Sequence, residues 1–293
     1  MGDILTKSGS MVVRPLSDAL GAEVTGIDVT AIDDATLGRL RDALHDNIVI
    51  VVREQDLTPK AQAAMTARFG EIQFHISDEF AIPGQSEVVV LTNEVAPDGK
   101  PLGNPGAGAD WHTDHAYLDR PTGYTFLHGV RIPKEGGDTA WRNMVKAYEI
   151  LPDATRRRLE GLVGIYTFNR NRNPRMKPHT RPGYGADYYE KRSPPDAFHP
   201  LVRTHPFTGR KALYFSARIT IGICDMDDRE AQPLLDELFA HVDNNAPVYR
   251  HTWRKGDLTI WDNRQTMHIA LGGVKPPEIR RMHRSTVLGE KPF

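Results

Sequence analysis

The order of apolar and polar residues predicts a chain made mainly of short strands, with a few amphipathic helices. Apolar or alternating runs between turn residues are typical of strands. Such runs lie at 11–16, 22–29, 48–52, 87–92, 124–132, near 201, and at 213–216, 248–253, 257–261 and 282–288. Strands predominate after residue 111, which favours a β-barrel or jelly roll with flanking helices over an alternating β-α-β chain.

Three segments have the periodicity and end signals of helices. Asp33 or Asp34 is a suitable N-cap for the first helix. Thr58 precedes a proline and begins a second helix, which we expect to close at Gly70. The third, 227–242, alternates apolar and charged residues at helical spacing.

One long segment, 169–198, shows neither a strand nor a helix period and is rich in proline. A segment of this length inside a compact domain is usually a functional lid or a disordered insert. We expect an active-site lid here, within a single domain that covers residues 1–293. Its basic residues either contact an acid group or form a solvated face, and they are Arg170, Arg172, Arg175, Lys177 and Arg181.

Composition excludes several classes of protein. The 293 residues are 39% hydrophobic and 26% charged, as in a soluble globular protein. The net charge of −1 gives no electrostatic reason to bind nucleic acid or an acidic membrane. No apolar run approaches the roughly 18 residues of a membrane span, and the first residues lack a signal-peptide pattern. Cys224 is the single cysteine, which excludes an internal disulfide and favours a cytoplasmic protein.

Candidate chemistry begins at Trp111, followed by His112, Thr113 and Asp114. In a strand, residues i and i+2 point the same way, so His112 and Asp114 can hold one metal ion. His268 follows an apolar strand that ends in a polar turn, a natural position for a third ligand. Two imidazoles and one carboxylate suit non-haem Fe(II), because they leave the opposite side of the metal open. A zinc hydrolase with the same three ligands is the alternative, and it would need a nearby general base.

The other histidines give no second ligand pair of this quality. His241 and Asp243 have the same spacing but lie in a predicted helix, where they project about 200° apart. We assign the following histidines to structural roles: His45, His115, His199 and His205.

A pair of arginines lies in the last predicted strand. Arg280 and Arg284 share one face of it, and Arg281 lies on the other. Inward guanidinium groups are costly unless anions pair with them. The partners are either the protein's own carboxylates or two small anions.

Four motifs together resemble one family. In order they are Trp-His-Thr-Asp at 111–114, Gly-Gly-Asp-Thr at 136–139, Trp-Asp-Asn-Arg at 261–264, and Arg-x-Met-His-Arg at 280–284. They resemble the Fe(II)/2-oxoglutarate dioxygenases of the taurine dioxygenase and dichlorophenoxyacetate dioxygenase type, over nearly the whole chain. The resemblance implies a mostly β fold with a double-stranded β-helix (jelly-roll, cupin-like) core and flanking helices. It also implies Fe(II), 2-oxoglutarate and O2 as cofactor and cosubstrates, and a homo-oligomer, either a dimer or a tetramer.

The resemblance further implies roles for individual residues. His112, Asp114 and His268 match the iron ligands, and Thr139 and Arg280 match the groups that bind the distal carboxylate of 2-oxoglutarate. The reaction would release succinate and CO2 while a substrate C–H bond is hydroxylated.

Substrate contacts follow from the same resemblance. Arg284 and His75 match residues that hold the acid group of a substrate. Apart from the resemblance, the position of Tyr117 beside the triad indicates that it either lines the pocket or has a packing role. A small anionic substrate is therefore expected: a sulfonate, sulfate ester, phosphonate or carboxylate. Asp78 stands where taurine dioxygenase has an aromatic residue, which argues against taurine itself.

Overall fold

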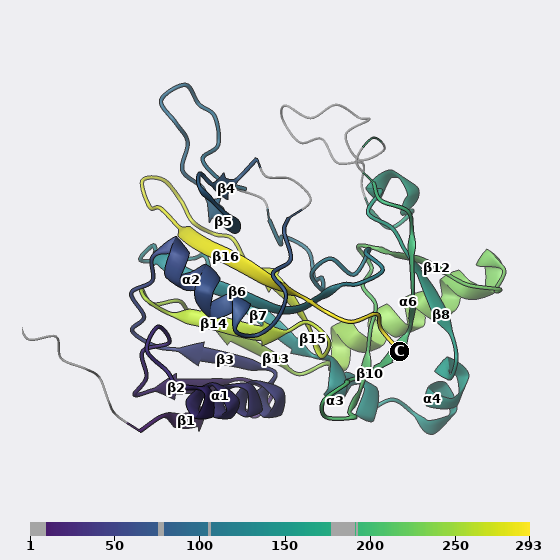
Figure 1. Cartoon of the computed structure of the whole chain (residues 1–293). Helices are drawn as coiled ribbons and strands as arrows, with labels where there is room; N and C mark the ends of the chain where they lie inside the picture. Colours follow the sequence, from purple (N-terminus) through teal and green to yellow (C-terminus); the bar gives the residue numbers. More distant parts are fainter. Residues whose placement is uncertain (1–9, 76–78, 105–106, 177–190, 192) are drawn as a thin grey trace, which may run out of the picture.

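The computed structural model describes residues 10–75, 79–104, 107–176, 191 and 193–293 (Figure 1). Half of the predicted lid, at 177–190 and 192, lies outside the described residues, and so does Asp78.

Most strands belong to one large sheet with the order β1-β2-β3-β14-β6-β16-β5-β4. Its strands are β1 (Val12–Pro15), β2 (Ala22–Thr25), β3 (Val49–Val52), β4 (Ala81–Ile82), β5 (Gln85–Thr92), β6 (Thr122–Arg131), β14 (Leu258–Asp262) and β16 (Arg281–Leu288). Every neighbouring pair is antiparallel except β2 and β3. The strands β14, β6 and β16 lie in the middle of this order, away from both edges of the sheet.

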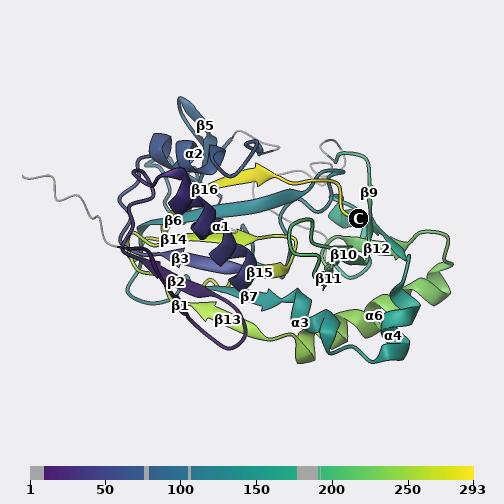
Figure 2. The same cartoon turned by 60° about the horizontal axis from the view of Figure 1, so that its bottom comes forward.

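A small antiparallel sheet lies on one side of the large one (Figures 1 and 2). Its strands are β13 (Val248–His251), β7 (Thr139–Asn143) and β15 (Thr266–Ala270), in the order β13-β7-β15. Side chains from both sheets line one cavity, so the two sheets enclose a common interior. The mostly β architecture agrees with the sequence prediction, and two facing sheets are consistent with a jelly roll.

Shorter elements complete the chain. They are α1 (Asp34–Asn47), α2 (Pro59–Ala67), α3 (Met144–Glu149), α4 (Asp153–Leu159), β8 (Val163–Tyr166), the 3-10 helix η1 (Arg170–Arg172), β9 (Ala197–Pro200), β10 (Val202–Thr204), β11 (Lys211–Leu213), β12 (Thr220–Ile223) and α6 (Asp228–Asn245). Helices α1 and α2 cover the large sheet, whereas α6 packs against α3 and β12 (Figure 2).

The three predicted helices begin where their capping residues indicate. Asp33 accepts a hydrogen bond from the backbone N–H of Thr36, so Asp33 rather than Asp34 is the N-cap. Thr58 caps α2 in the same way, and Asp227 caps α6. Each side-chain oxygen satisfies a backbone donor that has no partner within its helix.

Some predicted boundaries were wrong. Strand β2 ends at Thr25 rather than residue 29, because Gly26 adopts a left-handed φ of 81° that a continuing strand does not allow. Strand β16 begins at Arg281, so Arg280 precedes the strand in which it was predicted. The short helices α3 and α4 were not predicted, since each is too short to show a clear helical period.

The core has two main clusters on opposite sides of the large sheet. Neighbouring residues of β14 enter different clusters: Ile260 packs with Leu40 of α1, and Trp261 packs with Trp141 of the small sheet. Full burial of one large apolar side chain contributes about 1.5–3 kcal/mol, so this alternation strongly fixes the register of β14. That register also fixes the turn after β14, which leads into β15 and His268.

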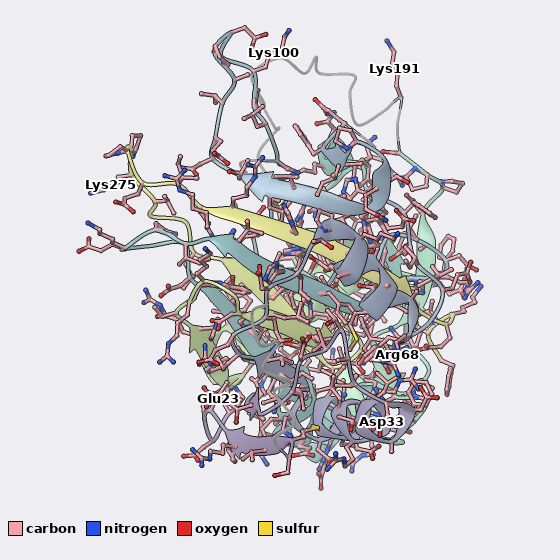
Figure 3. The ribbon with its side chains drawn as sticks, turned by 60° about the vertical axis from the view of Figure 1, so that its left-hand side comes forward. Glu23, Asp33, Arg68, Lys100, Lys191 and Lys275 are labelled. Carbon is pink, nitrogen blue, oxygen red and sulfur yellow. The ribbon has the colours of Figure 1, made fainter. Side chains whose placement is uncertain are left out.

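The surface carries charged side chains of both signs. Figure 3 shows Lys100, Lys191 and Lys275 pointing away from the body of the molecule. Among the described residues, no helix combines the length and the apolar character needed to cross a membrane.

Candidate active site

The three predicted metal ligands come together beside β15, the edge strand of the small sheet. Backbone hydrogen bonds join His112 N to His268 O at 3.0 Å, and His268 N to His112 O at 2.8 Å. The two imidazole rings lie 4.1 Å apart. With Asp114, they offer three ligand atoms that all lie within 4.8 Å of one another. A residue pair 156 positions apart in sequence is thus held by one antiparallel bridge.

The ionisation states of these groups suit a divalent cation. The Nδ1–H of His112 donates to the carbonyl oxygen of Asp110 at 2.7 Å, so its Nε2 keeps a free electron pair. Burial lowers the pKa of His112 well below its ordinary value and that of His268 to about 4. Burial alone would raise the pKa of Asp114, but the positive charge of Arg284 brings it well below its ordinary value. Two neutral imidazoles and one carboxylate are a fitting donor set for Fe(II).

A cavity of about 230 Å³ opens beside this triad. It contains six of the residues named from the sequence, namely His112, Asp114, Thr139, His268, Arg280 and Arg284. The predicted metal ligands, cosubstrate residues and one substrate arginine therefore share one space.

Arg280 is held from behind by the Gly-Gly turn. Its Nε–H donates to the carbonyl oxygen of Gly137 at 2.8 Å. A Cβ atom at position 137 would lie 2.7 Å from Cδ of Arg280, so the arginine requires glycine there. Burial lowers the pKa of Arg280 to about 10, against a weaker opposing effect of Asp138. Among the described residues, neither terminal nitrogen of Arg280 has a hydrogen-bond partner, so both are available to an anion.

Thr139 lies in the same cavity, and a hydrogen bond from Trp253 orients its hydroxyl group. The indole N–H of Trp253 donates to Oγ1 of Thr139 at 3.0 Å. The hydroxyl oxygen is thus an acceptor on the protein side, which leaves its own hydrogen for an acceptor in the cavity. Trp253 also lies 5.9 Å below the guanidinium of Arg280. No motif in the sequence marks this tryptophan as a site residue.

Arg284 approaches the metal-binding carboxylate. Its Nη2 lies 2.8 Å from Oδ1 of Asp114, yet it is buried and makes no hydrogen bond of good geometry with any described residue. Arg281 instead turns toward Glu94, at 3.5 Å. The predicted division of the arginines between two faces is therefore confirmed for Arg281 and Arg284.

His75 and Tyr117 lie outside the residues that line the cavity. Each packs against His115, with ring centroids 5.6 Å and 5.8 Å away. His115 itself is buried beside Asp114 in a left-handed backbone conformation, with φ of 51°. The ring of Tyr117 packs against His115 and Phe168, so its predicted place in the substrate pocket stays a prediction.

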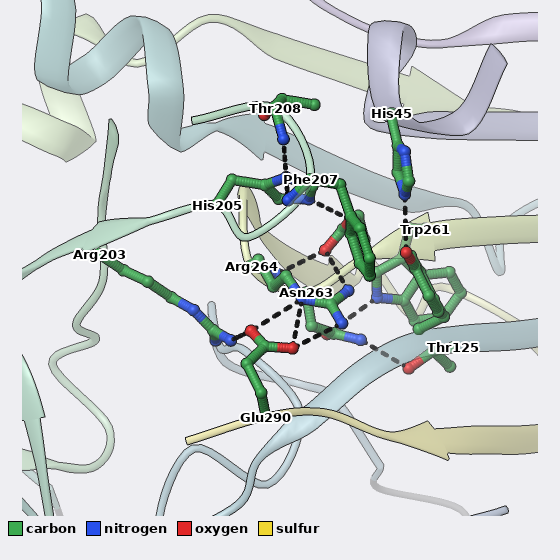
Figure 4. A network of polar contacts seen from close by, with 12 residues as sticks. His45, Thr125, Arg203, His205, Phe207, Thr208, Trp261, Asn263, Arg264 and Glu290 are labelled. Carbon is green, nitrogen blue, oxygen red and sulfur yellow. Dashed lines mark hydrogen bonds and ion pairs between the residues drawn. The ribbon is translucent and has the colours of Figure 1, made fainter. Parts of the chain in front are cut away.

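A second cluster also combines two histidines and a carboxylate: His45, His205 and Asp262 (Figure 4). Nδ1 of His205 accepts backbone N–H bonds from residues 207 and 208, so its Nε2 must carry the proton that it donates to Asp262 at 2.8 Å. Arg264 also pairs with Asp262. A proton and a guanidinium thus occupy the positions that a metal would need, which supports the predicted structural role.

The remaining ambiguous residues have local partners. Nε2 of His241 contacts the carbonyl oxygen of Ala147 at 2.8 Å, whereas Asp243 pairs with Arg142 at 2.5 Å. His241 and Asp243 therefore do not act together, as predicted. The described arginines of the predicted lid form the ion pairs Arg170–Asp110, Arg172–Asp196 and Arg175–Asp236.

Comparison with known proteins agrees with this geometry. The family model described as taurine catabolism dioxygenase TauD, TfdA family, matches residues 13–286. The chain belongs to this family. It is 32% identical to pentalenolactone F synthase of Streptomyces arenae over 96% of this chain and 97% of that protein. It is 31% identical to the alpha-ketoglutarate-dependent 2,4-dichlorophenoxyacetate dioxygenase of Cupriavidus pinatubonensis, over 88% and 91%.

Solved structures show the same likeness. A putative alpha-ketoglutarate-dependent taurine dioxygenase from Burkholderia xenovorans matches with a TM-score of 0.78 and 33% identity, covering 97% of this chain and 91% of that one. AAD-2, solved with Mn(II) and N-oxalylglycine, matches with a TM-score of 0.79 and 27% identity, over 97% and 98%. The protein is a 2-oxoglutarate-dependent dioxygenase, an oxidoreductase that uses Fe(II), 2-oxoglutarate and O2. Nothing in these comparisons supports the zinc-hydrolase alternative.

Proposed function

We propose that this dioxygenase hydroxylates a small anionic organic molecule and releases succinate and CO2. The observation that carries the proposal is one cavity that holds a His-Asp-His triad together with two half-buried arginines. Each guanidinium can pair with a separate anion. The distal carboxylate of 2-oxoglutarate is one of these anions, so the substrate supplies the other.

The metal site consists of His112, Asp114 and His268. Three protein ligands leave the opposite side of Fe(II) open to the cosubstrate and O2. The bound iron and 2-oxoglutarate supply the oxidising power of the reaction, while the protein orients the reactants and excludes competing chemistry.

The cosubstrate is bound by Thr139 and Arg280 at the far end of the cavity. The free terminal nitrogens of Arg280 suit a bidentate pair with a carboxylate. Because the indole of Trp253 donates to Oγ1, the hydroxyl hydrogen of Thr139 can bond the same carboxylate. Both groups therefore fix one end of 2-oxoglutarate and direct its keto acid end to the metal.

The substrate's acid group is bound by Arg284, with His75 and Tyr117 closing the side near His115. Relatives support an anionic substrate: one 30% identical over 95% of this chain is named alkylsulfatase, from Acinetobacter baylyi. Sulfonates, sulfate esters, phosphonates and aryloxy or alkyl carboxylates all offer the acid oxygens that a guanidinium binds. Hydroxylation of a carbon that bears a heteroatom gives an unstable product, so the reaction cleaves such a substrate and releases an aldehyde.

The same proposal extends to the architecture. We infer that the two facing sheets form a double-stranded β-helix within one domain of residues 1–293, closed by the segment 169–198 as a lid. We also infer that the enzyme is a homo-oligomer in the cytoplasm.

A substrate panel tests the proposal directly. The protein is incubated with Fe(II), ascorbate, 2-oxoglutarate and one compound from each acid class, and succinate is measured. At least one anionic compound is expected to increase succinate formation above the uncoupled background, and the neutral amide or alcohol analogue is not. Equal stimulation by neutral analogues would contradict an anionic substrate.

A further inference from the structure

The metal-binding carboxylate rests on a small buried network from two central strands of the large sheet. Asn263 follows β14 directly, and Thr125 lies in β6, opposite Trp261 of β14. The side chains of Asn263 and Thr125 are fully buried, with 0% exposure. Figure 4 shows the amide of Asn263 joined to both Trp261 and Thr125.

The orientation of the Asn263 amide follows from its partners. Oδ1 of Asn263 lies 3.1 Å from the indole Nε1 of Trp261 and 3.2 Å from the backbone N of Asp114. Both of these groups can only donate, so the atom between them must be the amide oxygen. The amide nitrogen Nδ2 therefore faces Thr125, at 2.9 Å from Oγ1.

The direction of the next bond is fixed in turn. Oγ1 of Thr125 accepts from Asn263, so its single hydrogen is free for another acceptor. That acceptor is Oδ2 of Asp114, at 2.7 Å. Hydrogen bonds to a carboxylate are among the stronger ones in proteins. All the hydrogen bonds of this network join buried groups.

The network acts on the atoms that would contact the metal. Oδ1 of Asp114 lies 3.7 Å from Nε2 of His112, and Oδ2 lies 3.9 Å from Nε2 of His268. Rotation of the carboxylate about its Cβ–Cγ bond would break the bond from Thr125. A second anchor, the backbone N–H of Asp114, is held by Asn263. The carboxylate therefore keeps one plane relative to the two imidazoles.

We propose that Asn263 and Thr125 are positioning residues that set the affinity of the metal site through Asp114. This inference rests on the proposed role of the triad, and it assigns the Trp-Asp-Asn-Arg turn a function in metal binding. Loss of a residue that orients a metal ligand typically weakens metal binding by about 10–100-fold.

Four variants and Mn(II) alone as the probe test the proposal. Thr125→Val removes the hydroxyl at nearly constant volume, and Thr125→Ser restores it. Asn263→Asp keeps the acceptor for Trp261 and Asp114 but replaces the donor to Thr125, so it draws the threonine hydrogen away from Asp114. Thr259→Val is the matched control, because Thr259 is equally buried and its hydroxyl has no hydrogen-bond partner among the described residues.

The measurements are the Kd for Mn(II), by calorimetric titration, and the melting temperature of each metal-free protein. Thr125→Val and Asn263→Asp are expected to raise the Kd about 10–100-fold. Thr125→Ser is expected to stay within about threefold of the wild type, as is Thr259→Val. The serine rescue separates positioning from packing, since serine restores the donor without the methyl group.

Two results would overturn the inference. One is a wild-type Kd in both Thr125→Val and Asn263→Asp, whatever their melting temperatures. The other is an equal loss of affinity in Thr259→Val, which would indicate a general packing effect. Failure of the proposed function looks different: Asp114→Ala would then bind Mn(II) as tightly as the wild type.

Discussion

Replacement of Arg280 by glutamine tests the assignment of the cosubstrate site. Burial lowers the pKa of Arg280 to about 10 from an ordinary value of 12.5. That difference corresponds to about 3 kcal/mol of unfavourable burial of the charge, which a bound carboxylate offsets. Loss of one partner of a buried charge pair typically costs about 2–5 kcal/mol. We therefore expect Arg280→Gln to raise the KM for 2-oxoglutarate at least about 30-fold.

Arg281→Gln is the matched control for this experiment. Arg281 is the next residue, carries the same charge, and pairs with Glu94 on the other side of the strand. Because such a partly exposed pair contributes about 0–1 kcal/mol, its loss should leave the KM for 2-oxoglutarate within about twofold. The assay is succinate formation at varied 2-oxoglutarate and fixed Fe(II). A rise in KM that is equal in both variants, or confined to Arg281→Gln, would refute the assignment.

Further expectations concern the substrate, the metal and acid stability. Arg284→Ala should raise the KM for the organic substrate about tenfold or more and change the KM for 2-oxoglutarate less than threefold. An equal rise in both KM values would contradict the assignment of Arg284 to the substrate and Arg280 to 2-oxoglutarate. Asp114→Ala should abolish succinate formation while circular dichroism shows an intact fold, and retained activity would exclude the triad. Burial lowers the pKa of His199 from 6.5 to about 4. The unfolded chain therefore binds this proton first, and His199 alone should contribute about 3 kcal/mol to the fall in stability between pH 6.5 and 4; urea titrations should show a smaller fall in His199→Phe.

Much of the site could be predicted because strand geometry is local. The period of two predicted His112 and Asp114 on one side, although only His112 makes a β-bridge and Asp114 lies in the turn that follows. The same rule separates Arg281 from Arg284 in β16. Capping rules identified the starts of α1 and α2 for the same reason, since each depends on one side chain and a backbone N–H within three residues.

Other features depend on contacts between distant segments. The bond from Trp253 to Thr139 joins β7 to the residues after β13, and the bond from Asn263 to Thr125 joins the end of β14 to β6. No local pattern marks Thr125, which is one polar residue within a buried strand. Asn263 belongs to a motif quoted from the sequence, but its role depends on the indole and backbone donors that only the fold brings to it.

The position of Tyr117 shows a different limit. Its closeness in sequence to Asp114 suggested either a place in the pocket or a packing role, and His115 adopts a left-handed φ of 51° between them. That conformation changes the direction of the chain, and strand alternation does not apply beyond it. The ring of Tyr117 consequently packs on Phe168, 4.7 Å away.

The stoichiometry of the reaction tests the central claim most directly. With the best substrate of the anionic panel, consumed 2-oxoglutarate, consumed O2, formed succinate and oxidised substrate are measured together in the presence of Fe(II). One equivalent of each is expected, and no conversion when Zn(II) replaces Fe(II) or when 2-oxoglutarate is omitted. Substrate conversion with Zn(II) and without 2-oxoglutarate would contradict it.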